Sequence, residues 1–418
     1  MNNIDFSIFN KLGCDRQFSY INFKPYVNKR KLICGALVGF DKGTINWINK
    51  LNDLSGDYFF LSEVTGDKEV ETFERIKMPF ICTPRSLAKE EIVTNVSCKL
   101  EIKKMKHVYK NSLLRLCMKQ MRNMYPQISF AYAIEWVCFA ETFILRLIKE
   151  LKPQEIYLWN IYYPFHRIIK YVAEKSCIPV KCIEFGCIPG TIAMDDVGQQ
   201  GEALPFREGK VFRKNSVSSQ MLDITRKKIQ HIYMTGENRN EQNIDLNCSF
   251  ERKKEKTTIL FLGCNDLEST FMSLDRKKVA SAIFSSSQES YRFVKKKCIK
   301  NKWLLKYKPH PIEVVRYGDK IYDENYVYGN INWLIDSVDL VITPFSQCAY
   351  ISLIRGVPVV LLGYSELCGT GAVYEVNRRS EFETIVKLAL KDGITDQMKN
   401  DFLIHVSQML NFYLLKME

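Results

Sequence analysis

The chain has 418 residues, more than one hydrophobic core usually supports, so we expect two domains. Hydrophobic residues make up 46% of the sequence and charged residues 26%, which are the values of an ordinary globular protein and exclude disorder as the default. Lys and Arg outnumber Asp and Glu by 60 to 47, and the net charge of +13 favours an anionic partner: nucleic acid, an anionic membrane surface or a phosphorylated substrate.

Apolar runs rich in β-branched and aromatic residues alternate with helical patterns along the chain, which predicts the α/β class, with parallel sheets covered by helices. The first half predicts one Rossmann-like domain. Its expected elements are, in order, a strand, a helix, two strands, a long helix, a strand, a helix and a strand, at 31–40, 44–54, 57–62, 79–84, 128–151, 155–160, 165–176 and 180–186.

A polar and charged segment at about 209–256 follows and predicts a linker. The alternation of strands and helices then restarts as a second Rossmann-like domain, at 257–263, 285–302, 303–311, 331–338, 340–346, 348–356 and 357–363. We therefore expect an N-terminal domain at 1–245 and a C-terminal domain at 246–418. Because ligands of open parallel sheets gather at the carboxyl ends of the strands, we look for functional residues there.

The cysteines and the N-terminus predict a cytoplasmic protein. The fourteen cysteines form no CxxC pair, which argues against a zinc or thiol-redox motif and favours reduced thiols. The first residues, MNNIDFSIFNKLGCD, lack the charged start and the apolar core of a signal peptide. No uncharged apolar run reaches the ~18 residues of a membrane span. The longest candidate, 128–148, contains Glu135, Glu141 and Arg146 and predicts a buried helix.

The stretch WLLKYKPHP ends a predicted strand in a cation and an imidazole held between prolines. Proline restricts the backbone, so Lys308 and His310 have little entropy left to lose when they bind a ligand. A lysine beside a histidine suits a phosphate oxygen, either as a charge stabiliser or as a proton donor to a leaving group. The alternative is the end of an edge strand with incidental charges.

The next predicted strand ends at Ser346, directly before an apolar helix. Ser346 is therefore expected to be the N-cap of that helix, whose start would suit an anion. A phosphate could then be held by Lys308, His310 and Ser346 together. An ordinary helix cap is the alternative for Ser346.

A third candidate, IEFGCIPGTIAMDDVGQ, places Glu184 and Gly186 at the end of a strand, followed by a Pro-Gly-Thr turn and Asp195. Two carboxylates near a strand end could serve as nucleophile, general base or acceptor anchor. A turn-stabilising role for Asp195 is the alternative.

Two motifs are missing from the sequence. GxxxxGK[ST] is absent, which argues against a P-loop nucleotidase. No Asp-x-Asp pair occurs, which weakens any scheme in which a divalent metal holds a sugar nucleotide.

The order E-x-G-x-x-PGT-x-x-x-D-x-x-G, then KPHP, then a strand ending in Ser before an apolar helix resembles the bacterial capsule polysaccharide biosynthesis family of β-Kdo transferases. More distantly, it is similar to the bacterial sialyltransferases. The resemblance covers about 155–200 and 257–372. It implies two Rossmann-like domains in the GT-B arrangement, with an acceptor-side first domain and a second domain that binds a CMP-activated 3-deoxy-ulosonic acid, such as CMP-Kdo or a CMP-nonulosonate. It implies no cofactor and no metal.

The resemblance also implies roles for individual residues. His310 and Lys308 would hold the CMP phosphate with a hydrogen bond from Ser346, and Glu184 and Asp195 would line the reacting centre. The catalytic residues expected are thus Asp195, Glu184 and His310. The expected substrate-binding residues are Lys308, Ser346, Gly186, Thr191, Gly198, Gln347 and Gly263.

The sequence departs from the pattern of these relatives at Phe185, where sialyltransferases often have a second acid, at Gln200, near which relatives commonly have Asn, and at Gln347, which replaces a hydroxyl residue. The donor sugar, the catalytic carboxylate and the choice between retention and inversion stay open.

The leading hypothesis is a cytoplasmic glycosyltransferase on the inner face of the membrane. It would transfer Kdo or a nonulosonate from CMP to a capsule or lipopolysaccharide acceptor on a lipid carrier, and its basic surplus would dock it on the anionic inner-membrane surface. One alternative is a GT-B enzyme that recognises a UDP- or GDP-sugar through Glu366 or Glu375. Another is a non-catalytic nucleotide-sugar-binding partner of glycan assembly. Nucleic acid is not an expected partner, because the aromatic residues lie in core-like segments rather than between Lys and Arg.

Overall fold

The computed structural model of the chain describes residues 21–22, 31–35, 45–50, 58–64, 80–84, 102–238, 256–317 and 323–417. The chain divides into two compact units, Met1–Glu184 with Met417–Glu418, and Phe185–Lys416. The domain boundary expected between 245 and 246 lies outside the described residues.

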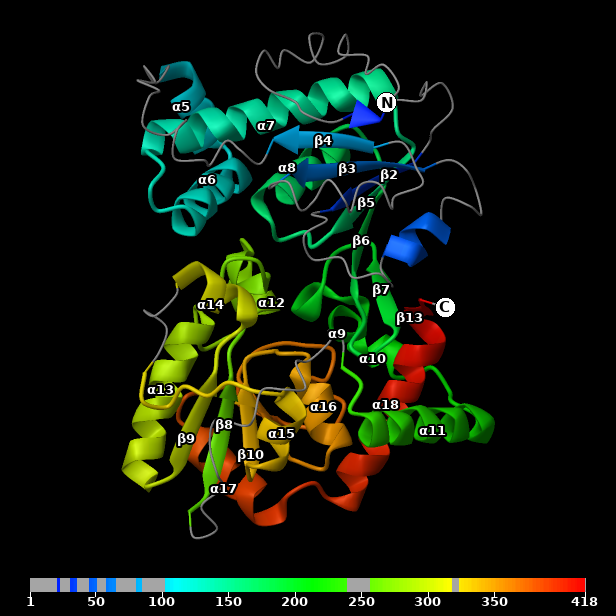
Figure 1. The fold of residues 1–418 in the computed structure, drawn as a ribbon, viewed down its shortest axis with the longest axis vertical. Helices are drawn as coiled ribbons and strands as arrows, with labels where there is room; N and C mark the ends of the chain where they lie inside the picture. The colour runs from blue at the N-terminus through cyan, green and yellow to red at the C-terminus, as the bar shows by residue number, and fades with distance from the viewer. Residues whose placement is uncertain are drawn as a thin grey trace. The chain divides into compact units, whose positions relative to one another are not determined.

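The strands of the first unit lie in the order β1-β4-β3-β2-β5-β6, and the last five of these have the order 3-2-1-4-5 of a Rossmann fold (Figure 1). All neighbouring strands among them are parallel except β1, which is antiparallel to β4. The strand order reverses between β2 and β5, which is the switch point of such a sheet. The bounds are β1 Ile21–Asn22, β2 Lys31–Gly35, β3 Tyr58–Val64, β4 Phe80–Pro84, β5 Glu155–Trp159 and β6 Val180–Phe185.

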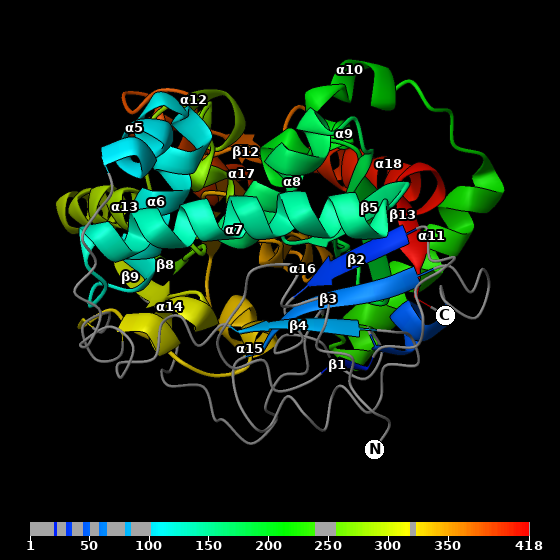
Figure 2. The ribbon, with the colours of Figure 1, turned by 90° about the horizontal axis from the view of Figure 1, so that it is seen from above.

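Polar caps fix where the long helices of the first unit begin. The Asn111 side chain accepts hydrogen bonds from the backbone at the start of α6, and the Ser129 hydroxyl does so at the start of α7. α7 packs along α8 (Figure 2). The ring centroids of Phe143 in α7 and Phe165 in α8 lie 6.4 Å apart. The bounds are α5 Ile102–Lys110, α6 Ser112–Met124, α7 Phe130–Leu151 and α8 Pro164–Lys175. Within the described residues, no helix combines the length and the apolarity that crossing a bilayer requires.

The second unit contains a five-stranded sheet in the order β9-β8-β10-β11-β12, and every pair in it is parallel. This is the other common doubly wound order, and it reverses between β8 and β10. The bounds are β8 Thr258–Leu262, β9 Leu304–Lys308, β10 Leu340–Thr343, β11 Val359–Leu361 and β12 Tyr374–Glu375. The α/β class with two Rossmann-like units is therefore confirmed.

Alternation along β8 builds a core on each side of this sheet. Ile259 and Phe261 belong to one buried cluster, and Leu260 and Leu262 to another, because successive side chains of a strand point to opposite faces. Helices supply the rest of both clusters. Their bounds are α13 Ser287–Asn301, α14 Pro311–Tyr317, α15 Ile331–Asp336, α16 Cys348–Ile354, α17 Phe382–Asp392 and α18 Asp396–Phe412.

The segment predicted as a linker is helical over much of its described length, so that prediction is wrong there. It contains α10, Gly209–Phe212, and the long α11, Ser219–Thr235, which packs against α18. Only Thr225 and Ile232 of α11 are buried, so the helix lacks the broad apolar stripe that would reveal it in the sequence. The part of the segment at 239–255 lies outside the described residues.

The second unit also contains an antiparallel pair of strands that was not expected from the sequence. β7, Thr191–Asp195, pairs with β13, Leu414–Lys416. The two strands are far apart in the chain, so no local pattern announces their pairing.

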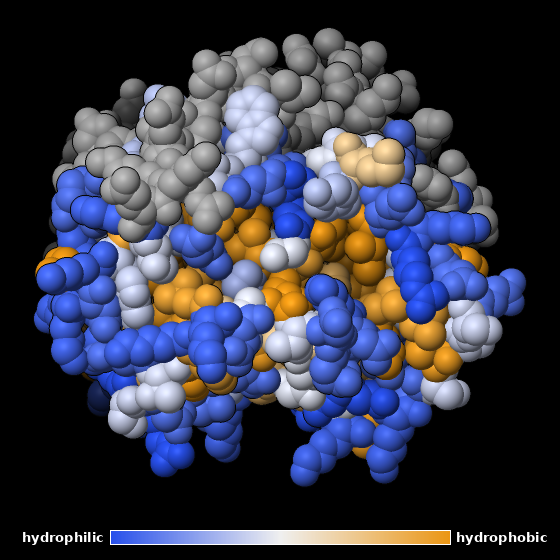
Figure 3. All heavy atoms as spheres, turned by 90° about the horizontal axis from the view of Figure 1, so that it is seen from below, coloured by the Kyte–Doolittle hydropathy of each residue, from blue (hydrophilic) through white to orange (hydrophobic). Residues whose placement is uncertain are grey.

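Large apolar side chains remain on the surface of both units, as single exposed residues such as Ile102, Met234 and Ile299. The face in Figure 3 likewise mixes hydrophobic with hydrophilic residues. Isolated apolar residues are normal on protein surfaces, so apolar exposure alone does not single out a docking face.

Candidate functional site

The carboxyl ends of three neighbouring strands meet at the switch point of the second sheet. The backbone N–H of Gly263, after β8, donates to the carbonyl of Lys308, at the end of β9, at 2.9 Å. The Thr343 hydroxyl, at the end of β10, donates to the carbonyl of Leu262 at 2.9 Å. Lys308, Gly263 and the residues after Thr343 are thereby brought together where open parallel sheets place their ligands.

Lys308 is a half-buried cation at this edge. Burial lowers the pKa of Lys308, and the nearby Cys348 thiol acts in the opposite direction as a smaller effect. Among the described residues, no hydrogen bond or ion pair of its side chain is found. A desolvated ammonium without a counter-charge is unfavourable, and an anion placed beside it would relieve that penalty. Lys308 therefore suits an anionic ligand.

One ring nitrogen of His310 accepts a hydrogen bond from the backbone. Its Nδ1 lies 3.3 Å from the backbone N of Ile312, which donates to it. A ring nitrogen that accepts carries no proton, so the neutral imidazole carries its proton on Nε2 and donates through it. The carbonyl of His310 accepts the backbone N–H groups of Glu313 and Val314, at the start of α14. The prolines and this short helix thus hold a hydrogen-bond donor two residues from Lys308.

Gly263 makes room for the KPHP turn. A Cβ at this position would lie 3.2 Å from the Pro309 Cα and 3.3 Å from the His310 backbone nitrogen. Glycine is required here for close approach of two backbones rather than for an unusual backbone angle. Gly263 therefore acts on the site by allowing β8 and the KPHP turn to pack together.

The prediction that Ser346 is the N-cap of the following helix is wrong by one residue. The N-cap of α16 is Gln347, whose own side chain makes no capping hydrogen bond. The Ser346 hydroxyl accepts the backbone N–H of Cys348 at 3.3 Å, and the Ser346 N–H donates to the Thr343 hydroxyl at 3.1 Å. The chain leaves β10 through a hydrogen-bonded turn before the helix begins, which is why the expected cap position is displaced. The Ser346 hydroxyl keeps its own proton for donation to a ligand.

The helix start that most α/β nucleotide sites use for phosphate is already filled. Asp266 accepts the backbone N–H of Ser287 at 2.5 Å and that of Gln288 at 3.3 Å, at the start of α13. A carboxylate at a helix N-terminus satisfies the same free N–H groups that a phosphate would. An anion at this edge is therefore expected nearer Lys308 than α13.

Gly186 and Thr191 form the turn between β6 and β7. The Gly186 N–H donates to the Thr191 carbonyl at 2.8 Å, and the Thr191 hydroxyl donates to the Ile188 carbonyl at 2.6 Å. A Cβ at Gly186 would lie 2.0 Å from that hydroxyl oxygen. Gly190 takes a positive φ of 75°. Both expected substrate-binding residues thus shape the backbone here, and the amide of Gln347 donates to the carbonyl of Phe185 next to them at 3.4 Å.

Asp195 is a buried carboxylate whose oxygens are occupied. It accepts the backbone N–H groups of Val197, Gly198 and Leu204 at 2.8, 3.2 and 2.7 Å. The Arg207 guanidinium lies 3.3 Å from one oxygen, and the Tyr413 hydroxyl donates to the other at 3.2 Å. These contacts close the loop 195–204. The turn-stabilising alternative therefore describes its observed contacts, and its expected catalytic role stays a prediction.

The loop that Asp195 closes is attached to the connection between β8 and α13. The Gln200 side-chain oxygen accepts the Thr270 hydroxyl at 2.8 Å, and the Ser273 hydroxyl donates to Glu202 at 3.0 Å. Gln200 takes a positive φ of 55°, a conformation that Asn adopts more readily. A Cβ at Gly201 would lie 2.0 Å from a backbone oxygen of Val279. Sequence analysis missed this attachment; only the glycines that flank Gln200 signal it.

The packing of Gly198 also belongs to this loop. A Cβ at Gly198 would lie 2.5 Å from the Glu202 Cβ. Its N–H is held by Asp195, so its expected part in substrate binding would be exerted through the shape of the loop.

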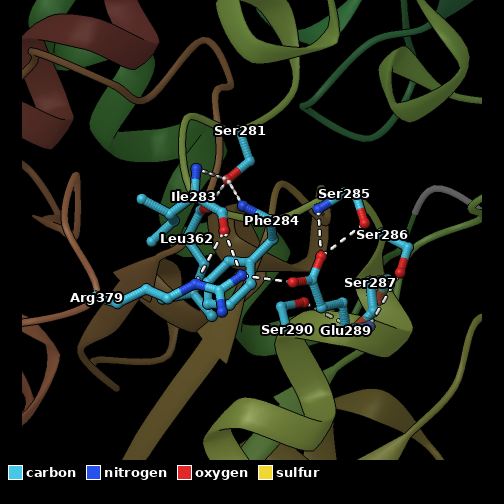
Figure 4. Close-up of polar contacts among 10 residues, drawn as sticks. All are labelled: Ser281, Ile283, Phe284, Ser285, Ser286, Ser287, Glu289, Ser290, Leu362 and Arg379. Carbon is cyan, nitrogen blue, oxygen red and sulfur yellow. Dashed lines mark hydrogen bonds and ion pairs between the residues drawn. The ribbon is translucent and has the colours of Figure 1, made fainter.

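A serine-rich segment beside the sheet edge is held by a polar network that the sequence analysis did not anticipate (Figure 4). The Ser281 hydroxyl donates to the Leu362 carbonyl at 2.6 Å, and Arg379 donates to the Ile283 carbonyl at 2.7 Å. Glu289 joins Arg379 to Ser285. Burial acts to raise the pKa of Glu289, but hydrogen bonds from Ser285 and the Arg379 charge lower it overall.

A small hollow lies beside this network, at the carboxyl ends of β11 and β12. Its lining residues are Ala282, Leu361, Leu362, Gly363, Tyr364, Glu375, Val376 and Asn377. One carboxylate oxygen of Glu375 accepts the Gly369 N–H at 2.7 Å. Glu366 is buried in the loop between the two strands.

Glu184, the remaining expected catalytic residue, lies in β6 of the first unit and is half-buried.

No protein-family model and no curated protein matches the chain. Among solved structures, the chain is similar to the β-Kdo 2,7 transferase KpsC of Thermosulfurimonas dismutans, at 15% identity, over 73% of this chain and 90% of that one, with a TM-score of 0.41.

Two further solved structures match the chain with similar identities and TM-scores. The β-Kdo 2,4 transferase KpsC of the same organism matches at 12% identity over 60% and 79% of the two chains, with a TM-score of 0.43. The S. aureus MnaA–UDP co-structure matches at 10% identity over 91% and 92%, with a TM-score of 0.38. All three TM-scores lie below 0.5, and the fold described above rests on the strand pairing of this chain alone.

Proposed function

We propose that the chain is a metal-independent glycosyltransferase of GT-B arrangement that takes Kdo or a nonulosonate from a CMP-activated donor to a glycan acceptor. The observation that carries the proposal is the half-buried Lys308 ammonium at the switch point of the second sheet, for which no counter-charge is found among the described residues. A nucleotide phosphate would supply that counter-charge. The donor phosphate would lie against Lys308, the Nε2–H of His310 and the Ser346 hydroxyl.

In this reaction the bond between the anomeric carbon and the phosphate oxygen breaks, and its electron pair leaves with CMP. Lys308 and His310 would stabilise the negative charge that develops on the leaving phosphate, in a partly desolvated place where such interactions are strong. The acceptor hydroxyl forms the new bond and gives its proton to a carboxylate, directly or after a covalent intermediate. Glu184 and Asp195 are the two candidates for that carboxylate, and Asp195 already accepts several backbone N–H groups.

A second candidate is a GT-B enzyme that uses a UDP- or GDP-sugar. The observation that favours it is the carboxylate of Glu375, which lies at the end of β12. A carboxylate at the carboxyl end of a parallel strand can accept hydrogen bonds from ribose hydroxyls. The KPHP and Pro-Gly-Thr turns, which resemble those of the β-Kdo transferases, favour the CMP donor instead.

Thermal melting of the full chain with CMP, UDP, GDP and buffer alone separates the candidates. A ligand that binds only the native state stabilises it by mass action and so raises the melting temperature. At a ligand concentration one hundred times the dissociation constant, the free energy of unfolding rises by ~2.7 kcal/mol. A shift with CMP alone supports the proposal, and a shift with UDP or GDP alone replaces it with the second candidate. CMP binding without turnover of CMP-Kdo or CMP-sialic acid on any glycan acceptor would favour the non-catalytic partner.

We further propose that the protein acts at the inner face of the cytoplasmic membrane, where a lipid-linked acceptor would be presented. Its net charge of +13 favours an anionic surface, on which each nearby cation contributes ~1 kcal/mol.

A further inference from the structure

The helices α5 and α6 carry an unusual concentration of positive charge. From Ile102 to Ile134 the sequence contains no Asp and no Glu, while Lys and Arg occur at 103, 104, 106, 110, 115, 119 and 122. This segment is therefore a strong local source of positive potential. One other stretch of the sequence, 290–312, is also free of Asp and Glu and contains eight Lys and Arg.

Two basic residues of α5 are paired with acids of α7. The Lys104 ammonium lies 2.7 Å from Glu135, and His107 Nε2 lies 2.6 Å from Glu141. These contacts attach α5 to α7.

The remaining basic residues are exposed. Along α5, Lys103, Lys106 and Lys110 follow a spacing of three and four residues, and along α6, Arg115, Lys119 and Arg122 do the same, so each helix has one basic face. Among the described residues, none of the six forms an ion pair. Ile102 and Tyr109, which are 66% and 44% exposed, border the basic face of α5, and the ring centroid of Tyr109 lies 6.1 Å from that of Phe130.

The lysines of α13 make a useful contrast, because the sequence alone does not distinguish the two regions. Lys295 pairs with Asp323 and Glu324, at 3.1 and 2.7 Å, and Lys297 pairs with Glu383 at 2.6 Å. Their charge is neutralised within the protein, whereas the charge of α5 and α6 is not.

We propose that the basic faces of α5 and α6 dock the protein on an anionic lipid bilayer. Exposed lysines and arginines attract phosphate headgroups, and the aliphatic part of their side chains can lie along the interface. An aliphatic and an aromatic side chain beside them, Ile102 and Tyr109, can enter the boundary between headgroups and acyl chains. Nucleic acid would match the charge but leave Ile102 without a favourable environment. The inference rests on the proposed membrane association and assigns it to one surface.

The test measures binding of the full chain to phosphatidylglycerol vesicles and to phosphatidylcholine vesicles by flotation, at low and high salt. We expect binding to the anionic vesicles only, weakened by salt because exposed charges are screened within ~10 Å at 0.1 M. Charge reversal of Lys106 and Lys110 (K106E with K110E) should weaken it about tenfold or more. Ile102→Ser should weaken it a few-fold without changing the salt dependence.

The chain offers a matched control. Lys387 and Lys391 of α17 are also exposed and also four residues apart, so K387E with K391E makes the same change in net charge elsewhere. Equal weakening by both pairs would show that net charge alone is responsible and would overturn the assignment. Binding of a duplex oligonucleotide that is sensitive to K106E with K110E, without vesicle binding, would replace the bilayer with nucleic acid.

Failure of this inference can be separated from failure of the proposed function. The rise in melting temperature with CMP does not depend on vesicles, so it should persist in K106E with K110E. Loss of vesicle binding in the unmodified chain with an intact CMP shift would overturn only the docking surface. An absent CMP shift with selective vesicle binding would overturn only the donor.

Discussion

Lys308 and Asp195 both lie at the carboxyl end of a strand in the second unit, yet their surroundings are opposite. Asp195 accepts hydrogen bonds from three backbone N–H groups and from Tyr413, and it lies beside Arg207. Lys308 is half-buried with no partner found among the described residues. A charged group that the fold satisfies by itself maintains the fold. A charged group that the fold desolvates without supplying a partner is suited to bind a ligand of opposite charge.

The largest effect should come from Asp195. Asp195→Ala leaves the backbone donors of Val197, Gly198 and Leu204 without an acceptor, and each buried unsatisfied donor costs about 1–3 kcal/mol. We expect the free energy of unfolding to fall by about 3 kcal/mol or more, measured by urea denaturation. Asp196→Ala changes the exposed neighbouring residue and is the control. A loss below about 1 kcal/mol for Asp195→Ala would remove the contrast with Lys308.

Lys308→Met should give the opposite pattern. It keeps the length of the side chain and removes the charge, so the protein should melt at the same temperature or slightly higher. Transfer should fall about 100-fold or more, since one preorganised group on developing charge is worth that much. Lys387→Met, on the surface of α17, should change neither. Unchanged transfer in an active Lys308→Met enzyme would return the KPHP turn to a structural role.

His405 adds a third kind of buried group, one that the fold keeps uncharged. Burial lowers the pKa of His405 to about 3, with a further contribution from the Arg213 charge. The unfolded chain therefore binds a proton below about pH 6.5 that the folded chain does not. Stability is fully present above that pH and should fall by about 2 kcal/mol between pH 6.5 and 5.

Urea denaturation across this pH range checks the expectation, with His405→Gln as the comparison. The variant loses its contact with the Tyr350 hydroxyl, 2.8 Å away in the native protein, so its stability should be lower throughout. Its slope against pH should be shallower over the same window. Parallel slopes would mean that other groups account for the acid sensitivity.

The smallest effect concerns Ser346. Ser346→Ala removes one hydrogen bond to the ligand, worth about 1 kcal/mol, so the dissociation constant of CMP should rise about fivefold. Isothermal titration measures it. Ser346→Thr keeps the hydroxyl and should retain most of the affinity. Equal affinities for all three proteins would remove Ser346 from the phosphate site.

Local patterns in the sequence predicted much of the fold and placed the KPHP turn and Ser346 after neighbouring strands. Strands such as 257–263 and 340–346 are continuous apolar runs, so β8 and β10 were found near their expected places. The KPHP turn and Ser346 follow such strands, and parallel topology brings them to one edge. That reasoning needs only residues close in sequence and a general rule about sheets.

What the sequence did not predict depends on distant partners. The Asp195 carboxylate accepts hydrogen bonds from Leu204 and Tyr413, which lie further along the chain. Gln200 likewise accepts a hydrogen bond from the distant Thr270. The α11 helix was missed because it buries few side chains. No spacing rule links such positions. The sequence therefore did not reveal that the oxygens of Asp195 already accept hydrogen bonds within the protein.

The bond between Asp195 and Tyr413 has a consequence for how the protein is made. Its two residues are 218 positions apart, and β7 finds its partner β13 over a similar separation. At a synthesis rate of ~5–20 residues per second, the ribosome needs roughly 10–40 s to bring Tyr413 out after Asp195. Throughout that interval the loop 195–204 lacks one of its hydrogen bonds and β7 is an unpaired edge. The nascent second unit is then exposed to mispairing, and a chaperone that shields β7 would act on this interval.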